Sequence, residues 1–319
     1  MLEIRTISIK NFKTHSGAIY PKINLYYQQF GRQIGKAPIV LVNHSLTGDA
    51  NLTGDGGWWT EIIGKGKIID TDKYTILGFN IPGNGVKGQI FNKPEDFHTG
   101  DIASLFLLGL SNLKIKKLYA LIGGSIGGGI AWEMAAISKD ITKFLVPIAA
   151  DWKANDWIIA NTFLQKRIIE NSKQPLQDAR IHAMLTYRTP QSFENRFGRT
   201  LNKEQGIFNI ESWLIYHGEK LQKRFQLKAY VMMNHLLSSI NIEREGEIAL
   251  NIIKNIKSEI HMVAIESDLF FTPIEDQKTF NSCKKVKKNI YYHEIKSLHG
   301  HDAFLIESQS MEKILSKIF

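Results

Sequence analysis

Short runs of consecutive apolar residues, rich in β-branched side chains, recur along the chain and predict the strands of a sheet. These runs do not alternate between polar and apolar positions, which is typical of central strands covered on both faces. Segments with a helical period lie between several of them, including 102–113 and 126–137. We predict strands within 39–42, 74–79, 118–122, 144–148, 260–265 and 290–292.

Strands that alternate with helices indicate an α/β fold, with a mostly parallel sheet and helices on both faces. Residues 4–29 predict an antiparallel β pair before the first parallel strand, and residues 302–319 predict an amphipathic helix that closes the chain.

The alternation stops for more than a hundred residues in the second half of the chain. No convincing core strand lies between 151 and about 259, where helical patterns such as 157–170 and 229–240 occur instead. A long helical insertion between two core strands is expected to cover the carboxyl edge of the sheet, where ligands bind in open α/β folds. We therefore predict a core formed by 1–150 and 257–319, and a helical lid formed by 151–256.

The segment around Ser125 is the most informative stretch, because it carries a Gly-x-Ser-x-Gly motif between an apolar strand and an apolar helix. A serine at such a turn has a strained backbone and presents its hydroxyl at the edge of the sheet. Gly123 and Gly127 leave room where a Cβ would collide with the neighbouring strand or helix. A phosphate-binding loop fits less well, because no acidic partner follows the next strand. We predict that Ser125 is a nucleophile.

A serine nucleophile needs a base and a third group that orients the base, and in this arrangement both follow the serine in the sequence. Asp268 follows the strand at 260–265 and is the predicted acid, with Glu266 as the alternative. His301 precedes the last predicted helix and is the predicted base, with His299 as the alternative.

Two backbone amides are needed to stabilise the oxyanion that forms during acyl transfer. The first is the amide of Ile126, directly after the nucleophile. The second is expected from the polar loop 43–49 after the first parallel strand, and we assign it to Leu46.

Composition excludes several other classes of protein. The formal net charge is +9, but the 40 Lys and Arg residues are spread along the chain, with no basic stripe interleaved with aromatics of the kind that binds nucleic acid. No apolar stretch is long enough to span a membrane, the first residues lack the pattern of a secretory signal, and no spacing indicates a metal site. A single cysteine excludes a disulfide framework. We expect a cytoplasmic protein.

Several motifs in order along most of the chain resemble the homoserine O-acetyltransferases of methionine biosynthesis. The resemblance implies an α/β-hydrolase fold with a helical lid, and acetyl transfer from acetyl-CoA to the hydroxyl of L-homoserine in a ping-pong cycle through an acyl-serine. It implies acetyl-CoA as a co-substrate, no tightly bound cofactor and a homodimer formed through the lid. The motifs lie at 41–48, 57–59, 63–67, 70–74, 123–128 and 300–304.

The resemblance also implies roles for individual residues. It implies Ser125, Asp268 and His301 as the triad, Leu46 and Ile126 as the oxyanion donors, and Asp302 as the partner of the homoserine amino group. The arginine that faces the substrate carboxylate in the family corresponds to Lys166 or Arg167. The tyrosine segment that follows in the family has only residues 174–180 in its place.

The sequence leaves other functions open. With water as the acceptor, the same site would act as an esterase or thioester hydrolase. Transfer of acetyl to another hydroxy-amino acid, or transfer of succinyl in place of acetyl, needs the same triad. A binding protein that keeps the fold without catalysis is the third hypothesis, and the complete set of Ser, Asp and His argues against it.

Overall fold

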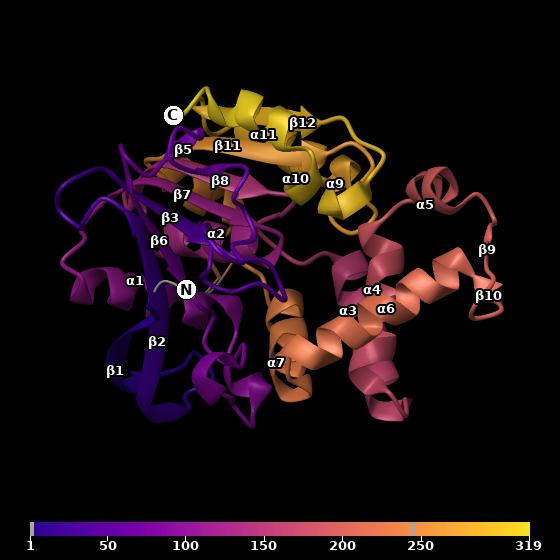
Figure 1. Cartoon of the computed structure of the whole chain (residues 1–319). Helices are drawn as coiled ribbons and strands as arrows, with labels where there is room; N and C mark the ends of the chain where they lie inside the picture. The colour runs from indigo at the N-terminus through magenta and orange to yellow at the C-terminus, as the bar shows by residue number, and fades with distance from the viewer. Residues whose placement is uncertain (1–2, 244–245) are drawn as a thin grey trace.

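An eight-stranded sheet runs through the centre of the computed structural model, which describes residues 3–243 and 246–319 (Figure 1). The strand order is β1-β2-β6-β3-β7-β8-β11-β12. β1 and β2 form the predicted antiparallel pair, and β2 also pairs antiparallel with β6. The other neighbouring pairs of this sheet, from β6 through β3, β7, β8 and β11 to β12, are all parallel. The strands are β1 (Arg5–Lys13), β2 (Ile19–Gly31), β3 (Ile39–Asn43), β6 (Thr75–Phe79), β7 (Leu118–Gly124), β8 (Thr142–Ile148), β11 (Glu259–Ile265) and β12 (Ile290–Ile295).

Each central strand contributes side chains to two hydrophobic cores, one on each face of the sheet. On β3, Leu41 belongs to the first core, whereas its neighbours Val40 and Val42 belong to the second. Successive side chains of a strand point to opposite faces, so a strand covered on both faces needs apolar residues at every position. This requirement explains the continuous apolar runs in the sequence and confirms the predicted α/β class.

Helices cover both faces of the sheet. α1 (Thr99–Asn112), α2 (Ile126–Ile137) and α9 (Pro273–Lys284) supply buried side chains to the first core, and α11 (Ser308–Leu315) supplies them to the second. The short elements are β4 (Ile63–Gly64), β5 (Ile69–Asp70), η1 (Val86–Gly88) and η2 (Pro94–Asp96). Among the described helices, none is both long and apolar enough to cross a bilayer.

The insertion between β8 and β11 is helical, with one two-stranded hairpin. Its first helices and the hairpin lie to one side of the sheet (Figure 1). α7 packs against the core helix α2, and its Met232, Met233 and Leu236 are buried. The boundaries 151 and 256 of the lid stay a prediction. The elements are α3 (Asp156–Asn171), α4 (Pro175–Tyr187), α5 (Pro190–Phe197), β9 (Leu201–Asn202), β10 (Ile207–Phe208), α6 (Asn209–Arg224), α7 (Leu227–Ser238) and α8 (Ala249–Asn255).

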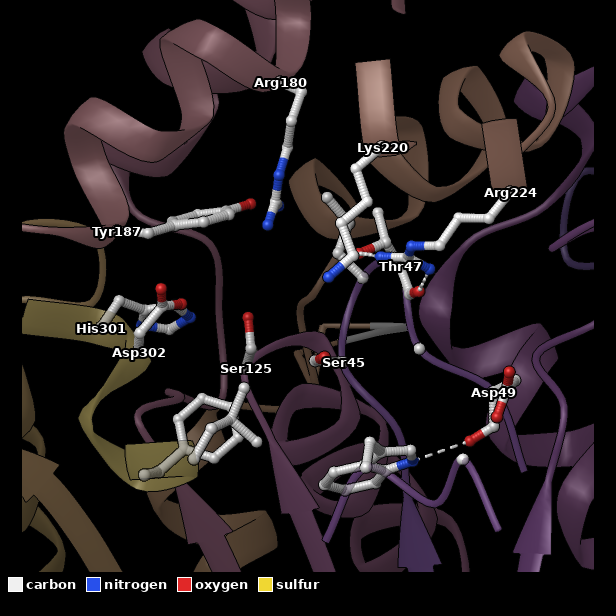
Figure 2. A pocket seen from close by; sticks show the side chains of 16 residues that line it. Ser45, Thr47, Asp49, Ser125, Arg180, Tyr187, Lys220, Arg224, His301 and Asp302 are labelled. Carbon is white, nitrogen blue, oxygen red and sulfur yellow. Dashed lines mark hydrogen bonds between the residues drawn. The ribbon is translucent and has the colours of Figure 1, made fainter. Parts of the chain in front are cut away.

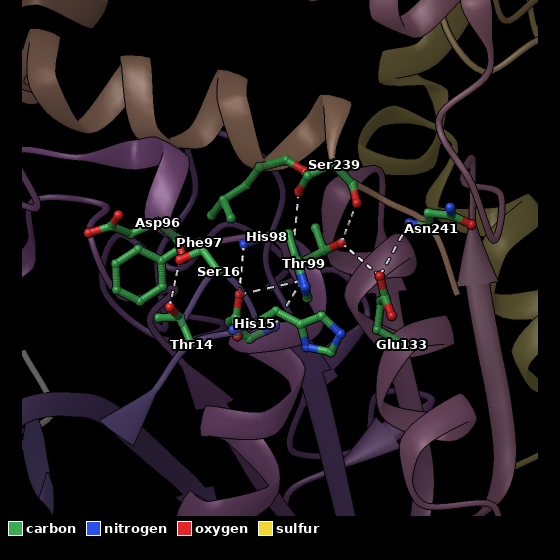
Figure 3. A network of polar contacts seen from close by, with 12 residues as sticks. Thr14, His15, Ser16, Asp96, Phe97, His98, Thr99, Glu133, Ser239 and Asn241 are labelled. Atoms are coloured by element: carbon green, nitrogen blue, oxygen red, sulfur yellow. Dashed lines mark hydrogen bonds and ion pairs between the residues drawn. The ribbon is translucent and has the colours of Figure 1, made fainter. Parts of the chain in front are cut away.

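A polar network fastens the end of this insertion to the core (Figure 3). The Thr99 hydroxyl donates to Glu133 Oε1 at 2.8 Å, and the same oxygen accepts from the Asn241 amide at 3.2 Å. The Thr99 amide donates to the Ser239 hydroxyl at 3.0 Å. Because these groups come from α1, α2 and the segment after α7, the network joins the insertion to two core helices.

The predicted closing helix over 302–319 is wrong in one respect, because the segment is broken. It forms η3 (Gly300–Asp302), α10 (Ala303–Ile306) and α11, with Glu307 between the two α-helices at φ −88° and ψ 60°. The Ser297 hydroxyl binds the Glu307 carboxylate at 2.7 Å, which stabilises this break. The break lets Phe304 pack against the turn that carries Ser125, as its contact with Gly124 indicates.

Candidate active site

Ser125 lies at the sharp turn between β7 and α2. Its backbone has φ 57° and ψ −129°, a region that costs a residue with a side chain about 1–3 kcal/mol. Hydrogen bonds on both sides hold the turn: the Ser125 amide donates to Ile148 O at 2.9 Å, and the Gly128 amide donates to Ser125 O at 2.8 Å. The hydroxyl therefore points into a cavity rather than along the helix (Figure 2).

The glycines of the motif are required by close backbone contacts. A Cβ on Gly123 would lie 2.1 Å from the carbonyl oxygen of Gly127. A Cβ on Gly127 would lie 2.5 Å from the carbonyl oxygen of Asn43. The second contact also explains how the loop after β3 comes so close to the start of α2.

Asp268 and His301 form a buried pair beside this turn. Asp268 Oδ2 lies 2.7 Å from His301 Nδ1, and both side chains are almost fully buried. The other carboxylate oxygen accepts hydrogen bonds from the amides of Phe270, at 2.7 Å, and Phe271, at 3.0 Å. Burial alone would lower the pKa of His301, but the charge and hydrogen bond of Asp268, and the charge of Asp302, outweigh burial and raise it.

The structure brings neither alternative residue to this pair. Glu266 is exposed at the end of β11, and its amide donates to Ile295 O. His299 Nδ1 lies 3.1 Å from the hydroxyl of Ser192 on α5. Of the candidates for acid and base, Asp268 and His301 are the two whose side chains contact each other.

The amides of Leu46 and Ile126 stay available for an oxyanion. In the described part of the chain, neither amide donates a hydrogen bond to a protein acceptor. The buried His44 holds the Leu46 loop in place, because its Nδ1 lies 2.8 Å from Ser45 O and its Nε2 accepts from the Ile81 amide at 3.0 Å. Burial lowers the pKa of His44, so the ring stays neutral and keeps one donor and one acceptor.

Ser125 and His301 line one cavity of about 470 Å³ (Figure 2). Tyr187 and Arg180 point into it from α4, and burial raises the pKa of Tyr187 to about 12, so its hydroxyl keeps its proton. Asp302 also lines the cavity, with Oδ2 3.9 Å from Arg188 Nε. The remaining lining residues are Ser45, Leu46, Thr47, Gly48, Asp49, Gly56, Trp58, Lys220, Arg224, Phe304 and Leu305.

The structure does not bring Lys166 and Arg167 to this cavity, so their predicted role as partners of the substrate carboxylate is corrected. Both side chains are exposed on α3 and pair with Glu170, at 3.9 Å and 2.9 Å. Arg180 is the arginine that points at Ser125, and Tyr187 faces the cavity from the same helix. Their spacing of seven residues, two turns of one helix, is a signal that the sequence contains.

A serine on a strained strand-to-helix turn, a buried His–Asp pair and a mostly parallel sheet define an α/β hydrolase. A family model described as "alpha/beta hydrolase fold" matches residues 38–166. A homoserine O-acetyltransferase of Chloroherpeton thalassium is 33% identical to the chain, over 96% of the chain and 87% of that protein. One from Methanococcus vannielii is 31% identical, over 99% of the chain and 72% of that protein. The chain belongs to the homoserine O-acetyltransferase family.

Solved structures agree with this assignment. The crystal structure of a homoserine O-acetyltransferase from Staphylococcus aureus superimposes with a TM-score of 0.82 at 25% identity, over 99% of the chain and 94% of that structure. The predicted family and fold are therefore confirmed.

Proposed function

We propose that this protein transfers an acetyl group from acetyl-CoA to the side-chain hydroxyl of L-homoserine, through an acetyl ester on Ser125. The observation that carries the proposal is that His301, paired with the buried Asp268, lines the same cavity as the strained Ser125. Relatives named homoserine O-acetyltransferase support the choice of acyl group and acceptor.

In the first half of the cycle, Ser125 Oγ attacks the thioester carbonyl carbon while His301 Nε2 takes the hydroxyl proton. The negative charge that develops on the carbonyl oxygen is stabilised by the amides of Leu46 and Ile126. When the carbon–sulfur bond breaks, the imidazolium returns the proton to the leaving thiolate. The products are free CoA and acetyl-Ser125.

In the second half, His301 takes the proton of the homoserine hydroxyl, whose oxygen attacks the carbonyl carbon of the acetyl ester. As the bond from that carbon to Ser125 Oγ breaks, His301 returns the proton to Oγ, which regenerates the free serine and the neutral base. Asp302 offers a carboxylate to the amino group of the acceptor. We assign the acceptor carboxylate to Arg180, with the Tyr187 hydroxyl as a second donor, since both point into the cavity. The CoA thioester is a co-substrate, and none of these steps needs a bound cofactor.

A homodimer through the lid is part of the proposal. α3 exposes four large apolar side chains, of which Ile159 and Phe163 lie four residues apart on one face, and exposed apolar side chains on one face favour a protein interface. A charged Asp in place of Phe163, which is 63% exposed, is expected to lower the molar mass seen by light scattering to that of a monomer. A monomeric parent protein would contradict this part. The four side chains are Trp157, Ile159, Phe163 and Leu164. Because the proposed donor is an acyl-CoA, we expect the reaction in the cytoplasm.

The proposal is tested by measuring thiol release from acetyl-CoA with and without L-homoserine, with mass spectrometry of the product. We expect the rate to depend on homoserine and the product to be its O-acetyl ester. A rate indifferent to homoserine, with acetate as product, would replace the transferase by a hydrolase.

Matched variants test the acceptor site. Charge-assisted hydrogen bonds contribute about 1.5–3 kcal/mol, so Arg180→Gln is expected to raise the KM for homoserine at least about tenfold. Lys166→Gln, on the same lid but outside the cavity, is expected to leave that KM unchanged. An equal effect of both variants would contradict the assignment of Arg180.

A further inference from the structure

Two cations on one face of α6 have no role in the proposed reaction. Lys220 and Arg224 line the cavity of Ser125 from the side opposite His301 (Figure 2). They are four residues apart on a helix, about 6 Å along its axis, so both side chains reach the same region. In the described residues, neither forms an ion pair with a carboxylate.

Positive charge accumulates at this side of the cavity. Arg180 points toward the same space from α4, again without an ion pair in the described chain. The pKa of the neighbouring His217, on the same face of α6, is lowered to about 4. Burial is the largest cause, and the nearby cations, including Arg180 and Lys220, lower this pKa further. Asp49 and Asp302 are the acids among the described residues that line the cavity.

Arg224 is held in position by the loop that carries the oxyanion donor Leu46. Its two terminal nitrogens donate to Thr47, one to the backbone oxygen at 2.8 Å and one to the hydroxyl at 3.2 Å. A guanidinium has five N–H donors, so three remain for a ligand. Because the side chain is already ordered, binding an anion there costs little additional rotamer entropy.

Arg224 also stands where two cavities adjoin. A groove of about 220 Å³ shares Thr47, Gly48, Asp49 and Arg224 with the cavity of Ser125. Its other walls are Asn84, Gly85, Val86, Phe225 and Gln226. An elongated ligand with its reactive carbon at Ser125 can therefore extend past Arg224 into this groove.

We propose that Lys220 and Arg224 bind the phosphate groups of the acyl-CoA donor, with the nucleoside beyond these phosphates in the adjoining groove. This inference rests on the proposed acyl-CoA chemistry. A nucleotide thioester is long, and its phosphates lie far from the thioester carbon. Phosphate oxygens suit a guanidinium fork and a lysine ammonium as hydrogen-bond partners. Lys220 lines the cavity of Ser125 and Arg224 lies at the junction of this cavity with the groove, and this placement of positive charge matches the position of the phosphates.

The test compares acetyl-CoA with S-acetyl-N-acetylcysteamine, a thioester without phosphates. Lys220→Gln and Arg224→Gln are each expected to raise the KM for acetyl-CoA about tenfold, because one charge-assisted contact is lost. Neither variant is expected to change the KM for the phosphate-free donor or for homoserine. Lys223→Gln is the matched control, since Lys223 is an exposed cation of the same helix that does not line either cavity.

Three outcomes would overturn the phosphate site. They are an equal rise in KM for both donors, an effect of Lys223→Gln as large as that of Arg224→Gln, and a selective rise in the KM for homoserine. The last outcome would assign these cations to the acceptor carboxylate. Arg224→Lys separates charge from the hydrogen bonds to Thr47: it is expected to restore part of the affinity for acetyl-CoA, and no restoration contradicts a charge-based role.

A binding experiment keeps this site independent of the proposed reaction. Calorimetry of CoA with the Ser125→Ala protein needs no turnover, and the Kd is expected to rise in Lys220→Gln and Arg224→Gln proteins and with added salt. If CoA binds in this way but no acetyl group is transferred, the proposed function fails and the phosphate site stands. If transfer proceeds and the CoA affinity of both variants is unchanged, the phosphate site alone fails.

Discussion

Replacing Asp268 by Asn tests how the base is oriented, because the hydrogen bonds around that side chain fix which way the amide turns. Oδ1 accepts from two backbone amides, those of Phe270 and Phe271, while Oδ2 faces His301 Nδ1. The Asn oxygen must keep the position of Oδ1, since an NH₂ group there would face two donors. The NH₂ group therefore faces Nδ1, which must become an acceptor, and the imidazole proton moves to Nε2.

An imidazole protonated at Nε2 cannot take the proton of Ser125, so the general base is lost while the fold is kept. A wrong tautomer of this kind reduces kcat by about 10⁴, or about 5 kcal/mol at 1.36 kcal/mol per factor of ten. The Tm is expected to change little, because the amide oxygen retains both backbone hydrogen bonds.

The assay is acetyl-CoA-dependent thiol release by the purified Asp268→Asn protein. Glu266→Gln is the matched control, since Glu266 lies two residues away and is exposed. We expect the control to retain the parent rate. A loss of less than tenfold in Asp268→Asn, or an equal loss in the control, would refute the argument that Asp268 orients His301.

Three further predictions follow from the same geometry. Because Asp268 and Asp302 raise the pKa of His301, kcat/KM for p-nitrophenyl acetate should fall with decreasing pH at a midpoint above 6.5. Asp302→Asn should move that midpoint to lower pH, and an unchanged midpoint refutes the electrostatic coupling between Asp302 and His301. Gly127→Ala places a Cβ 2.5 Å from Asn43 O, so we expect a clear drop in Tm by calorimetry and reject the contact if Tm is unchanged. Among the described residues, no group hydrogen-bonds to either buried carboxylate oxygen of Asp276, and burial raises the pKa of this carboxyl well above 3.8. The folded state therefore holds a proton that the unfolded state releases above pH 3.8, so the free energy of unfolding falls as pH rises. Asp276→Asn removes this loss and should raise Tm more at pH 7 than at pH 4; a gain in Tm that is independent of pH contradicts this.

The core of the fold, the turn at Ser125 and the pair of Asp268 and His301 were predictable because their signals are local. A strand buried on both faces must be apolar throughout, and the turn at Ser125 requires glycines where the backbones of Gly127 and Asn43 approach. Asp268 and His301 could be chosen because both follow strands at the carboxyl edge of the sheet, and the structure places them 2.7 Å apart.

The lid was harder to predict because one of its buried faces is polar. On α3, Asn161, Thr162 and Gln165 are buried, and α4 and α7 supply hydrogen-bond partners to Gln165 and to the backbone oxygen of Thr162. Gln165 Nε2 donates to Ala179 O at 3.0 Å, and Asn234 Nδ2 donates to Thr162 O at 2.9 Å. A hydropathy pattern predicts that such a polar face is exposed to solvent. The sequence therefore could not show which face of α3 is turned toward the rest of the protein.

The rotation of α3 decides which lid cations reach the substrate. With the polar face of α3 turned inward, Lys166 and Arg167 point outward to Glu170. The cavity receives its cations from α4 and α6 instead, through Arg180 and Arg224. Long-range packing between helices thus determines which cations line the cavity, whereas short-range backbone sterics determine the turn at Ser125.

The most direct test of the account is the intact mass of the protein after brief mixing with acetyl-CoA in the absence of an acceptor. We predict a mass increase of one acetyl group, mapped to Ser125 by peptide sequencing, absent from the Ser125→Ala protein and discharged by L-homoserine. An acetyl group on another residue, or acetyl transfer that persists at the parent rate in Ser125→Ala, would contradict the central claim that Ser125 carries the acyl group.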